Sequence, residues 1–115
     1  MVKRKGGYEA QRNEKMRGGE GFVTIENLLT PAELYDKGRL FAKITVDAGS
    51  SIGYHVHEGE MEAFHIVSGS AEFSDNGETV ILSVGDTALT SDGFGHSVKN
   101  AGDTPLEMIA LILFK

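Results

Sequence analysis

The sequence predicts a single all-β domain, a sandwich or barrel with little helix. Short runs rich in β-branched and aromatic residues recur along the 115 residues. The turns between them are expected to rely mainly on glycine, since the sequence has 15 glycines and only two prolines. No long segment repeats apolar residues with the 3.6-residue period of a helix, which excludes an alternating βαβ arrangement. The length is that of one compact domain.

The expected strands are short and are bounded by turn residues. They cover residues 22–25, 39–46, 53–57, 62–68, 71–74, 80–83, 87–90, 96–99 and 106–114. Residues 30–34 carry a capping threonine, a proline at the first helical position and Glu33, which predicts one helical turn. Asn76 and Gly77 predict a two-residue hairpin turn, because both positions of that turn take positive φ.

Charge is unevenly distributed along the chain. Residues 1–21 contain six Lys and Arg against three Glu, whereas residues 22–115 contain five against fourteen Asp and Glu. We therefore expect a basic, glycine-containing N-terminal arm over 1–21 and a single barrel domain over 22–115. The acidic body argues against a nucleic-acid groove. We expect the arm to be dispensable for folding but to contribute to the binding of an anionic ligand.

Several classes of protein are excluded by what the sequence lacks. It contains no cysteine, which rules out a disulfide scaffold, a zinc ribbon and a thiol nucleophile. Its longest apolar run is far shorter than the roughly 20 residues of a membrane span, and no apolar segment follows the basic N-terminus. We therefore expect a cytoplasmic protein that binds neither membrane nor nucleic acid.

Three of the four histidines and one glutamate form a candidate metal site. His55 and His57 are two residues apart, so both point to the same face of a strand. A loop then interrupts the strand and lets Glu62 face the same side, and His96 would supply a third imidazole. An isolated His-x-His is more often incidental than metal-binding, but the combination favours a metal site.

These residues fall on both sequence motifs of the cupin family, which the chain resembles. The first motif, G-x5-H-x-H-x4-E-x6-G, is matched by Gly49, His55, His57, Glu62 and Gly69. The second, G-x5-P-x-G-x2-H-x3-N, is matched by Gly85, Gly93, His96 and Asn100, with Ser91 where proline is usual. The serine changes the rigidity of a turn and leaves the metal ligands intact.

The resemblance implies a double-stranded β-helix, or jelly-roll barrel, that holds one divalent transition metal per chain. Its ligands would be His55, His57, Glu62 and His96. Three imidazoles and one carboxylate suit manganese or iron, with nickel, cobalt and zinc as alternatives. One or two positions on the metal are expected to stay open for a small-molecule ligand.

Four further residues are candidates for binding that ligand. Phe64 and Ile66 share the strand face of Glu62 and would form an apolar wall, and Phe94 lies shortly before His96. Arg17 could reach an anionic ligand from the N-terminal arm, although a glycine-rich arm is more often a linker.

The remaining charged residues near the motif receive simpler interpretations. His65 lies at an odd offset from Glu62, so we expect it to face away from the metal. We interpret Glu58 and Glu60 as solvated loop charges, with a role as a second carboxylate as the alternative.

Three functions fit this pattern. The first is a metal-dependent enzyme acting on a small, metal-chelating, oxygen-bearing substrate by dioxygenase-like or decarboxylase-like chemistry. The second is a binding or sensing protein without catalysis, favoured by the lack of a general acid or base beside the ligands. The third is a sugar isomerase. Oxalate decarboxylases carry an arginine three residues before the first histidine, where this chain has Ile52, which argues against oxalate.

A homodimer is the expected assembly. Small cupins commonly pair through strand edges and sheet faces, and residues 22–25 would form an open edge strand in an isolated barrel.

Overall fold

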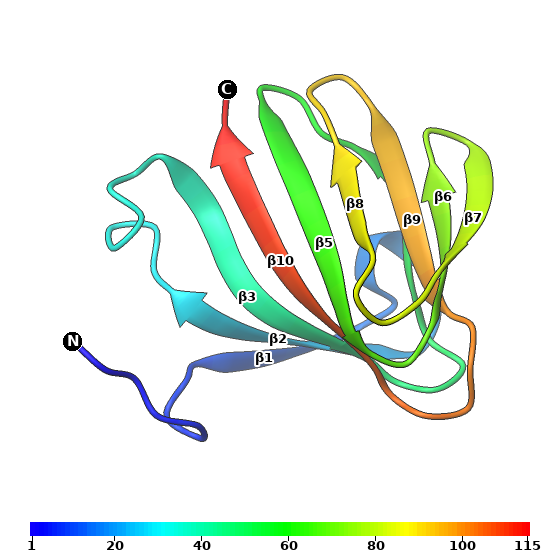
Figure 1. The fold of residues 1–115 in the computed structure, drawn as a ribbon, viewed down its shortest axis with the longest axis horizontal. Helices are drawn as coiled ribbons and strands as arrows, with labels where there is room; N and C mark the ends of the chain where they lie inside the picture. Colours follow the sequence, from blue (N-terminus) through cyan, green and yellow to red (C-terminus); the bar gives the residue numbers. More distant parts are fainter.

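Two antiparallel β-sheets face each other in the computed structural model, which describes all 115 residues (Figure 1). The elements are β1 (Ala10–Glu14), the 3₁₀ turn η1 (Met16–Gly18), β2 (Phe22–Leu29), β3 (Gly38–Val46), β4 (Ser51–Val56), β5 (Glu60–Ser68), β6 (Ala71–Asp75), β7 (Glu78–Leu82), β8 (Thr87–Thr90), β9 (Gly95–Asn100) and β10 (Leu106–Phe114). The expectation of an all-β fold with little helix is confirmed.

The strand order shows how the chain winds between the two sheets. One sheet has the order β1-β2-β3-β10-β5-β8, and the other has the order β4-β9-β6-β7. From β3 onward the chain passes repeatedly from one sheet to the other, so that distant segments become neighbours. All nine expected strands are present, with ends that differ by a few residues.

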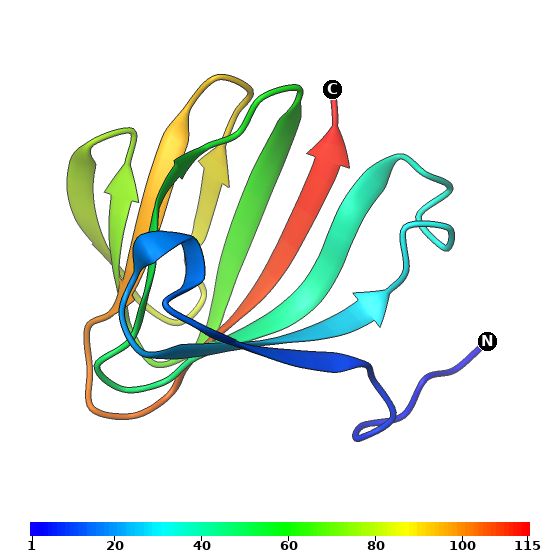
Figure 2. The ribbon, with the colours of Figure 1, turned by 180° about the vertical axis from the view of Figure 1, so that it is seen from behind.

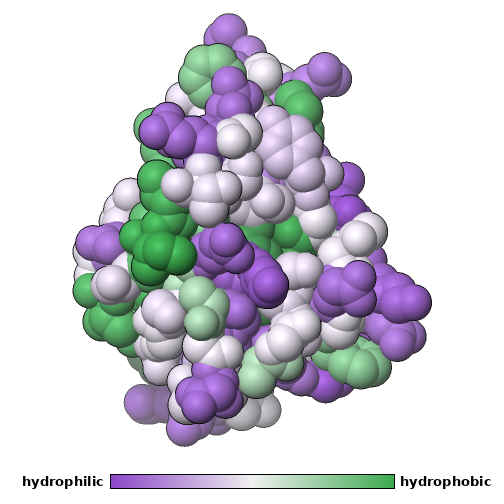
Figure 3. Space-filling view, turned by 90° about the vertical axis from the view of Figure 1, so that its right-hand side faces the viewer, coloured by the Kyte–Doolittle hydropathy of each residue, from purple (hydrophilic) through white to green (hydrophobic).

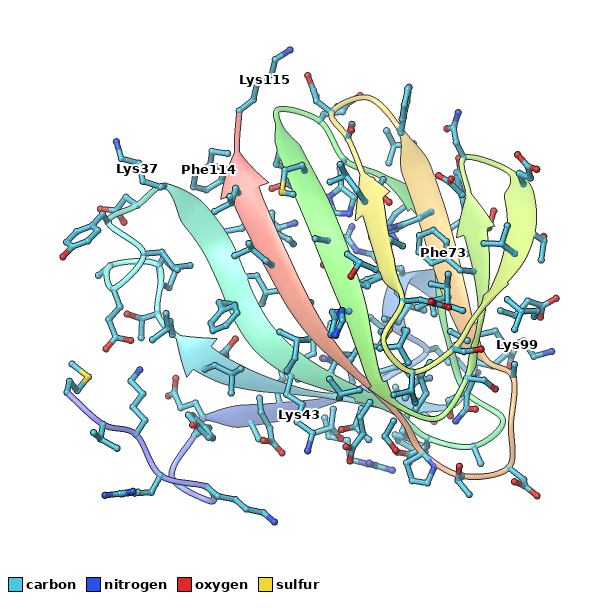
Figure 4. The ribbon with its side chains drawn as sticks, viewed as in Figure 1. Lys37, Lys43, Phe73, Lys99, Phe114 and Lys115 are labelled. Atoms are coloured by element: carbon cyan, nitrogen blue, oxygen red, sulfur yellow. The ribbon has the colours of Figure 1, made fainter.

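The core lies between the sheets and follows the two-residue period of the strands. On β10, Leu106, Met108, Ala110 and Ile112 are buried and alternate with more exposed residues. Phe73 on β6 points into the space between the sheets (Figure 4) and is 1% exposed. Burial of these side chains on both inner faces holds the sheets together.

Both turns indicated by the sequence form their expected local contacts. Asn76 and Gly77 connect β6 to β7 with φ values of 50° and 96°, which confirms the hairpin. The backbone N–H of Thr30 donates to Glu33, and the N–H of Glu33 donates to the Thr30 hydroxyl, as in a capping box. No helix follows, because the next residues continue as turns with positive φ at Tyr35.

The segment expected to be an arm contains a strand and a turn that packs on the barrel. Strand β1 pairs with β2 over its whole length, so residues 22–25 do not form an open edge and this argument for a dimer is wrong. The turn η1 lies against β4, as Figure 2 shows. The sequence did not reveal β1 because its residues AQRNE lack apolar alternation.

The outer surface mixes hydrophilic side chains with exposed apolar ones. Figure 3 faces the β6–β7 side and shows hydrophobic patches among hydrophilic residues. Ile81 on β7 is 61% exposed, and Leu89 on β8 is 55% exposed. The structure contains no helix of the length and apolarity needed to cross a membrane.

Candidate metal centre

The fold brings the four expected metal ligands together inside the barrel. His55 on β4 and His96 on β9 are directly paired neighbours across the four-stranded sheet. His57 follows the end of β4, and its backbone N–H donates to the carbonyl of Phe94. Glu62 enters from β5 in the opposite sheet after a loop in which Gly59 takes a φ of 75°. The interrupted strand expected between His57 and Glu62 is therefore present.

The ligand atoms converge on one point. Nε2 of His96 lies 3.1 Å from Nε2 of His57 and 3.1 Å from Nε2 of His55. Oε1 of Glu62 lies 3.0 Å from Nε2 of His57 and 3.0 Å from Nε2 of His96. All four ligand atoms fall within 4.8 Å of one another, and only His55 is not fully buried.

These separations suit an ion of high coordination number. Bonds of about 2.1 Å place neighbouring ligand atoms about 3.0 Å apart in an octahedral ion and about 3.4 Å apart in a tetrahedral one. The four separations of 3.0–3.1 Å are near those of octahedral neighbours, and the remaining pairs of ligand atoms lie within 4.8 Å. Four protein ligands then leave positions free for a small molecule.

Hydrogen bonds at the far side of each ring prepare the three histidines for metal binding. Nδ1 of His55 donates to the carbonyl of Gly53 at 2.8 Å, and Nδ1 of His57 donates to Glu60 at 2.9 Å. Nδ1 of His96 lies 2.8 Å from the hydroxyl of Thr90. A proton on Nδ1 of each ring would leave its Nε2 unprotonated and able to bind a metal ion at the centre.

Aromatic packing fixes the ring of His96. The imidazole stacks on Phe64 with ring centroids 5.0 Å apart and planes 12° from parallel. Phe73 meets the same imidazole edge-on at 5.6 Å. Because both phenylalanines are buried core residues, the position of this ligand is tied to the packing of the barrel.

Glu60 connects the centre to Arg39. The guanidinium of Arg39 donates two hydrogen bonds to the Glu60 carboxylate, at 2.7 and 2.8 Å. These bonds, together with the bond from His57, lower the pKa of Glu60 to about 2, so the carboxylate stays ionised. The interpretation of Glu60 as a solvated charge is wrong, since its side chain is 11% exposed and orients a ligand. Glu58 is exposed, as expected.

The charges around the site favour a cation within it. Burial lowers the pKa of His55 more than the hydrogen bond to the Gly53 carbonyl raises it, and the nearby Arg17 charge lowers it further, which favours the neutral ring. The bond to Glu62 raises the pKa of His57, against the effect of burial. Burial alone would raise the pKa of Glu62, but hydrogen bonds from His57 and His96 lower it overall. The carboxylates thus attract positive charge here, whether a proton or a metal ion.

A cavity of about 90 Å³ borders three of the ligands, His55, His57 and Glu62. Its remaining lining residues are mostly apolar, with two arginines: Met16, Arg17, Ile25, Arg39, Leu40, Ile44, Ile52, Phe64 and Ile112. The structure therefore brings two of the four candidate ligand-binding residues, Phe64 and Arg17, to the cavity.

The other candidate residues lie elsewhere. Ile66 is fully buried in the core and does not line the cavity, because it lies four residues beyond Glu62 along β5. Phe94 is 49% exposed on the loop before β9 and does not line the cavity either. His65 is exposed and contacts Thr87 on the outer face, so the expectation that it faces away is confirmed.

Comparison with known families identifies the family of the chain. The cupin-domain family profile matches residues 42–112, which include all four metal-ligand candidates. The chain belongs to the cupin family. Its double-stranded β-helix is thereby confirmed. The His and Glu cluster of the structure could hold one metal ion.

Other cupins extend the comparison. The chain is 42% identical over 113 residues to the "Oxalate-binding protein" of Thermotoga maritima, covering 98% of this chain and 93% of that protein. The crystal structure of "a predicted oxalate decarboxylase" from Thermotoga maritima superposes with a TM-score of 0.96 at 41% identity, over the whole of both chains. The Cnp3 cupin domain of Schizosaccharomyces pombe, 13% identical, shares the fold with a TM-score of 0.74, over 91% of this chain and 69% of that one.

Glu60→Gln tests the supporting role of this carboxylate in the cupin site. Loss of the charge weakens both the bond to His57 and the pairing with Arg39, and changes to such supporting partners lower metal affinity by about 10- to 100-fold. We expect a lowered affinity for manganese with the fold retained, measured by titration calorimetry and circular dichroism. Glu58→Gln removes an exposed charge two residues away and should leave the affinity unchanged. Equal affinities in the two variants would contradict the role of Glu60.

Proposed function

We propose that this cupin binds a small, metal-chelating carboxylate of the oxalate class at a divalent metal ion. The observation that carries the proposal is the convergence of the Nε2 atoms of three histidines and the Glu62 carboxylate beside a small cavity. The metal would be held by His55, His57, Glu62 and His96, with manganese or iron favoured by the ligand types. Once bound, the ion supplies positive charge and open positions for a chelating ligand.

The size and lining of the cavity support a small anion. Its volume of about 90 Å³ is well below the roughly 300–1,000 Å³ of pockets for larger ligands. A ligand of six non-hydrogen atoms such as oxalate suits this space better than a sugar phosphate, and the apolar wall offers few partners for sugar hydroxyls. The sugar-isomerase alternative therefore has the least support.

The absence of a separate acid or base favours binding over catalysis. Apart from the metal ligands, the only ionisable residues that line the cavity are Arg17 and Arg39, and neither is suited to proton transfer at neutral pH. Ile52 lines the cavity where oxalate decarboxylases carry an arginine, so this difference argues against decarboxylation of oxalate rather than against its binding. Decarboxylation remains the second candidate, because the Thermotoga maritima protein of 41% identity is described as a predicted oxalate decarboxylase.

Calorimetric titration of oxalate into manganese-loaded and metal-stripped protein tests the proposal. We expect binding only to the loaded protein, with one oxalate per chain, and much weaker binding of acetate. The absence of oxalate binding to the loaded protein would contradict the proposal. Release of carbon dioxide or formate from oxalate under the same conditions would instead favour the decarboxylase.

We further infer a homodimer that forms through the outer face of the six-stranded sheet. Phe41, Leu111, Ala63 and Leu89 are paired in register across four adjacent strands and point away from the core. Such a row of apolar side chains is typical of an interface rather than of a solvated face. Light scattering at micromolar concentration should give twice the chain mass of 12.4 kDa. A mass of one chain would contradict the dimer.

A further inference from the structure

The turn around η1 has an unusual backbone and places two residues at the metal cavity. Met16 and Arg17 both line the cavity. Lys15 and Arg17 take φ values of 50° and 55°, in the left-handed region that large side chains seldom adopt. Residues persist in such conformations only where surrounding contacts hold them, and they are frequent at functional sites.

Strand β4 supplies those contacts. A Cβ added to Gly53 would overlap the carbonyl of Arg17, and one added to Gly19 would overlap the carbonyl of Ser51, so the two backbones touch at glycines. The N–H of Glu20 donates to the Ser51 hydroxyl, and the N–H of Ser51 donates to the Glu20 carbonyl, each at 2.9 Å. The backbone of the turn is therefore fixed to the barrel wall beside the cavity, and the side chain of Arg17 extends from it as an exposed residue.

The two arginines at the cavity differ in what they already bind. Arg39 has Nε and Nη2 engaged by Glu60, so its charge is paired. None of the ion pairs in the protein involves Arg17. Its guanidinium is free to donate two parallel hydrogen bonds to a carboxylate.

We propose that Arg17 is the residue that selects dianionic over monoanionic ligands, by binding the carboxylate oxygens that the metal does not hold. This inference rests on the metal-dependent carboxylate binding proposed above. A dicarboxylate then meets positive charge on both sides, from the ion and from the guanidinium. A monocarboxylate has a single carboxylate, which binds the metal ion. Arg17 therefore adds little to its affinity. Arg17 lies far in sequence from both cupin motifs. It comes near the site because η1 packs on β4.

Competition between oxalate and acetate for manganese-loaded protein tests this inference. Arg17→Ala is expected to keep one manganese per chain but to weaken oxalate binding by about 10- to 100-fold, the size expected for a charge-assisted pair, while acetate binding changes less than about twofold. Arg17→Lys keeps the positive charge but loses the two parallel donors of the guanidinium. Its oxalate affinity should fall between those of Arg17→Ala and the unmodified protein. Arg4→Ala removes an exposed charge from the same N-terminal segment and should match the unmodified protein.

The outcomes separate this inference from the proposed function. If the loaded, unmodified protein does not bind oxalate, the proposed function fails and the role of Arg17 fails with it. If it binds oxalate and Arg17→Ala binds oxalate equally well with its manganese retained, only the role of Arg17 is overturned. An equal loss in Arg4→Ala would also overturn it, because the effect would then come from general charge rather than from the position of Arg17.

Discussion

His96→Ala is expected to abolish stoichiometric metal binding. His96 lies at the centre of the ligand cluster, with its Nε2 within 3.1 Å of the ligand atoms of the other three residues. Its removal leaves two imidazoles and one carboxylate with no fourth ligand. His55→Ala should also lose the ion, and Glu62→Gln should weaken binding with the fold retained. Equilibrium dialysis against manganese, followed by elemental analysis, measures the bound ion per chain.

His65→Ala is the matched control for the metal-ligand variants. It removes the same side chain from an exposed position on the outer face of β5. We expect it to retain one ion per chain. If the His55 and His96 variants also retained a full complement of metal, the ligand assignment would be wrong.

Phe73→Ala is expected to cause the largest loss of stability. Phe73 is 1% exposed and packs edge-on against both Phe64 and His96. Truncating a buried phenylalanine leaves a cavity and lowers the free energy of unfolding by about 3–5 kcal/mol. Urea denaturation of the metal-free protein measures this change without a contribution from the ion.

Ile81→Ala provides the comparison on the neighbouring strand. Ile81 is 61% exposed, and its removal should change the free energy of unfolding by less than about 0.5 kcal/mol. Because Phe73 also supports the ring of His96, the Phe73→Ala variant should bind manganese more weakly. A stability loss for Phe73→Ala no larger than that for Ile81→Ala would show that this part of the core is not tightly packed.

The sequence predicted which four residues come together at the candidate metal site, because their spacing follows strand geometry and two short motifs. The two-residue period of a strand places His55 and His57 on one face, and the motif spacing indicates Glu62 and His96. The supporting partners do not follow such rules. Thr90 reaches His96 only because β8 and β9 lie in facing sheets, and Arg39 on β3 meets Glu60 on β5 across the intervening β10. Glu60 carried a signal in the sequence, three residues after His57, but a charged loop residue is more often solvated.

The N-terminal segment shows where composition is a poor guide. Its charges and glycines favoured a loose arm, yet β1 extends a sheet and Gly19 allows close contact with β4. Both features depend on partners that are distant in sequence. Deletion of residues 1–21 would therefore expose β2 as well as remove Arg17, and single substitutions at Arg17 separate the two effects.

Titration of manganese into metal-stripped protein tests the central claim most directly, with free manganese followed by its electron paramagnetic resonance signal. The arrangement of His55, His57, Glu62 and His96 predicts that the free signal is suppressed until one ion per chain is bound, and that oxalate then alters the spectrum of the bound ion. A free signal that rises from the first addition, as in buffer alone, would show that these residues do not hold a metal ion.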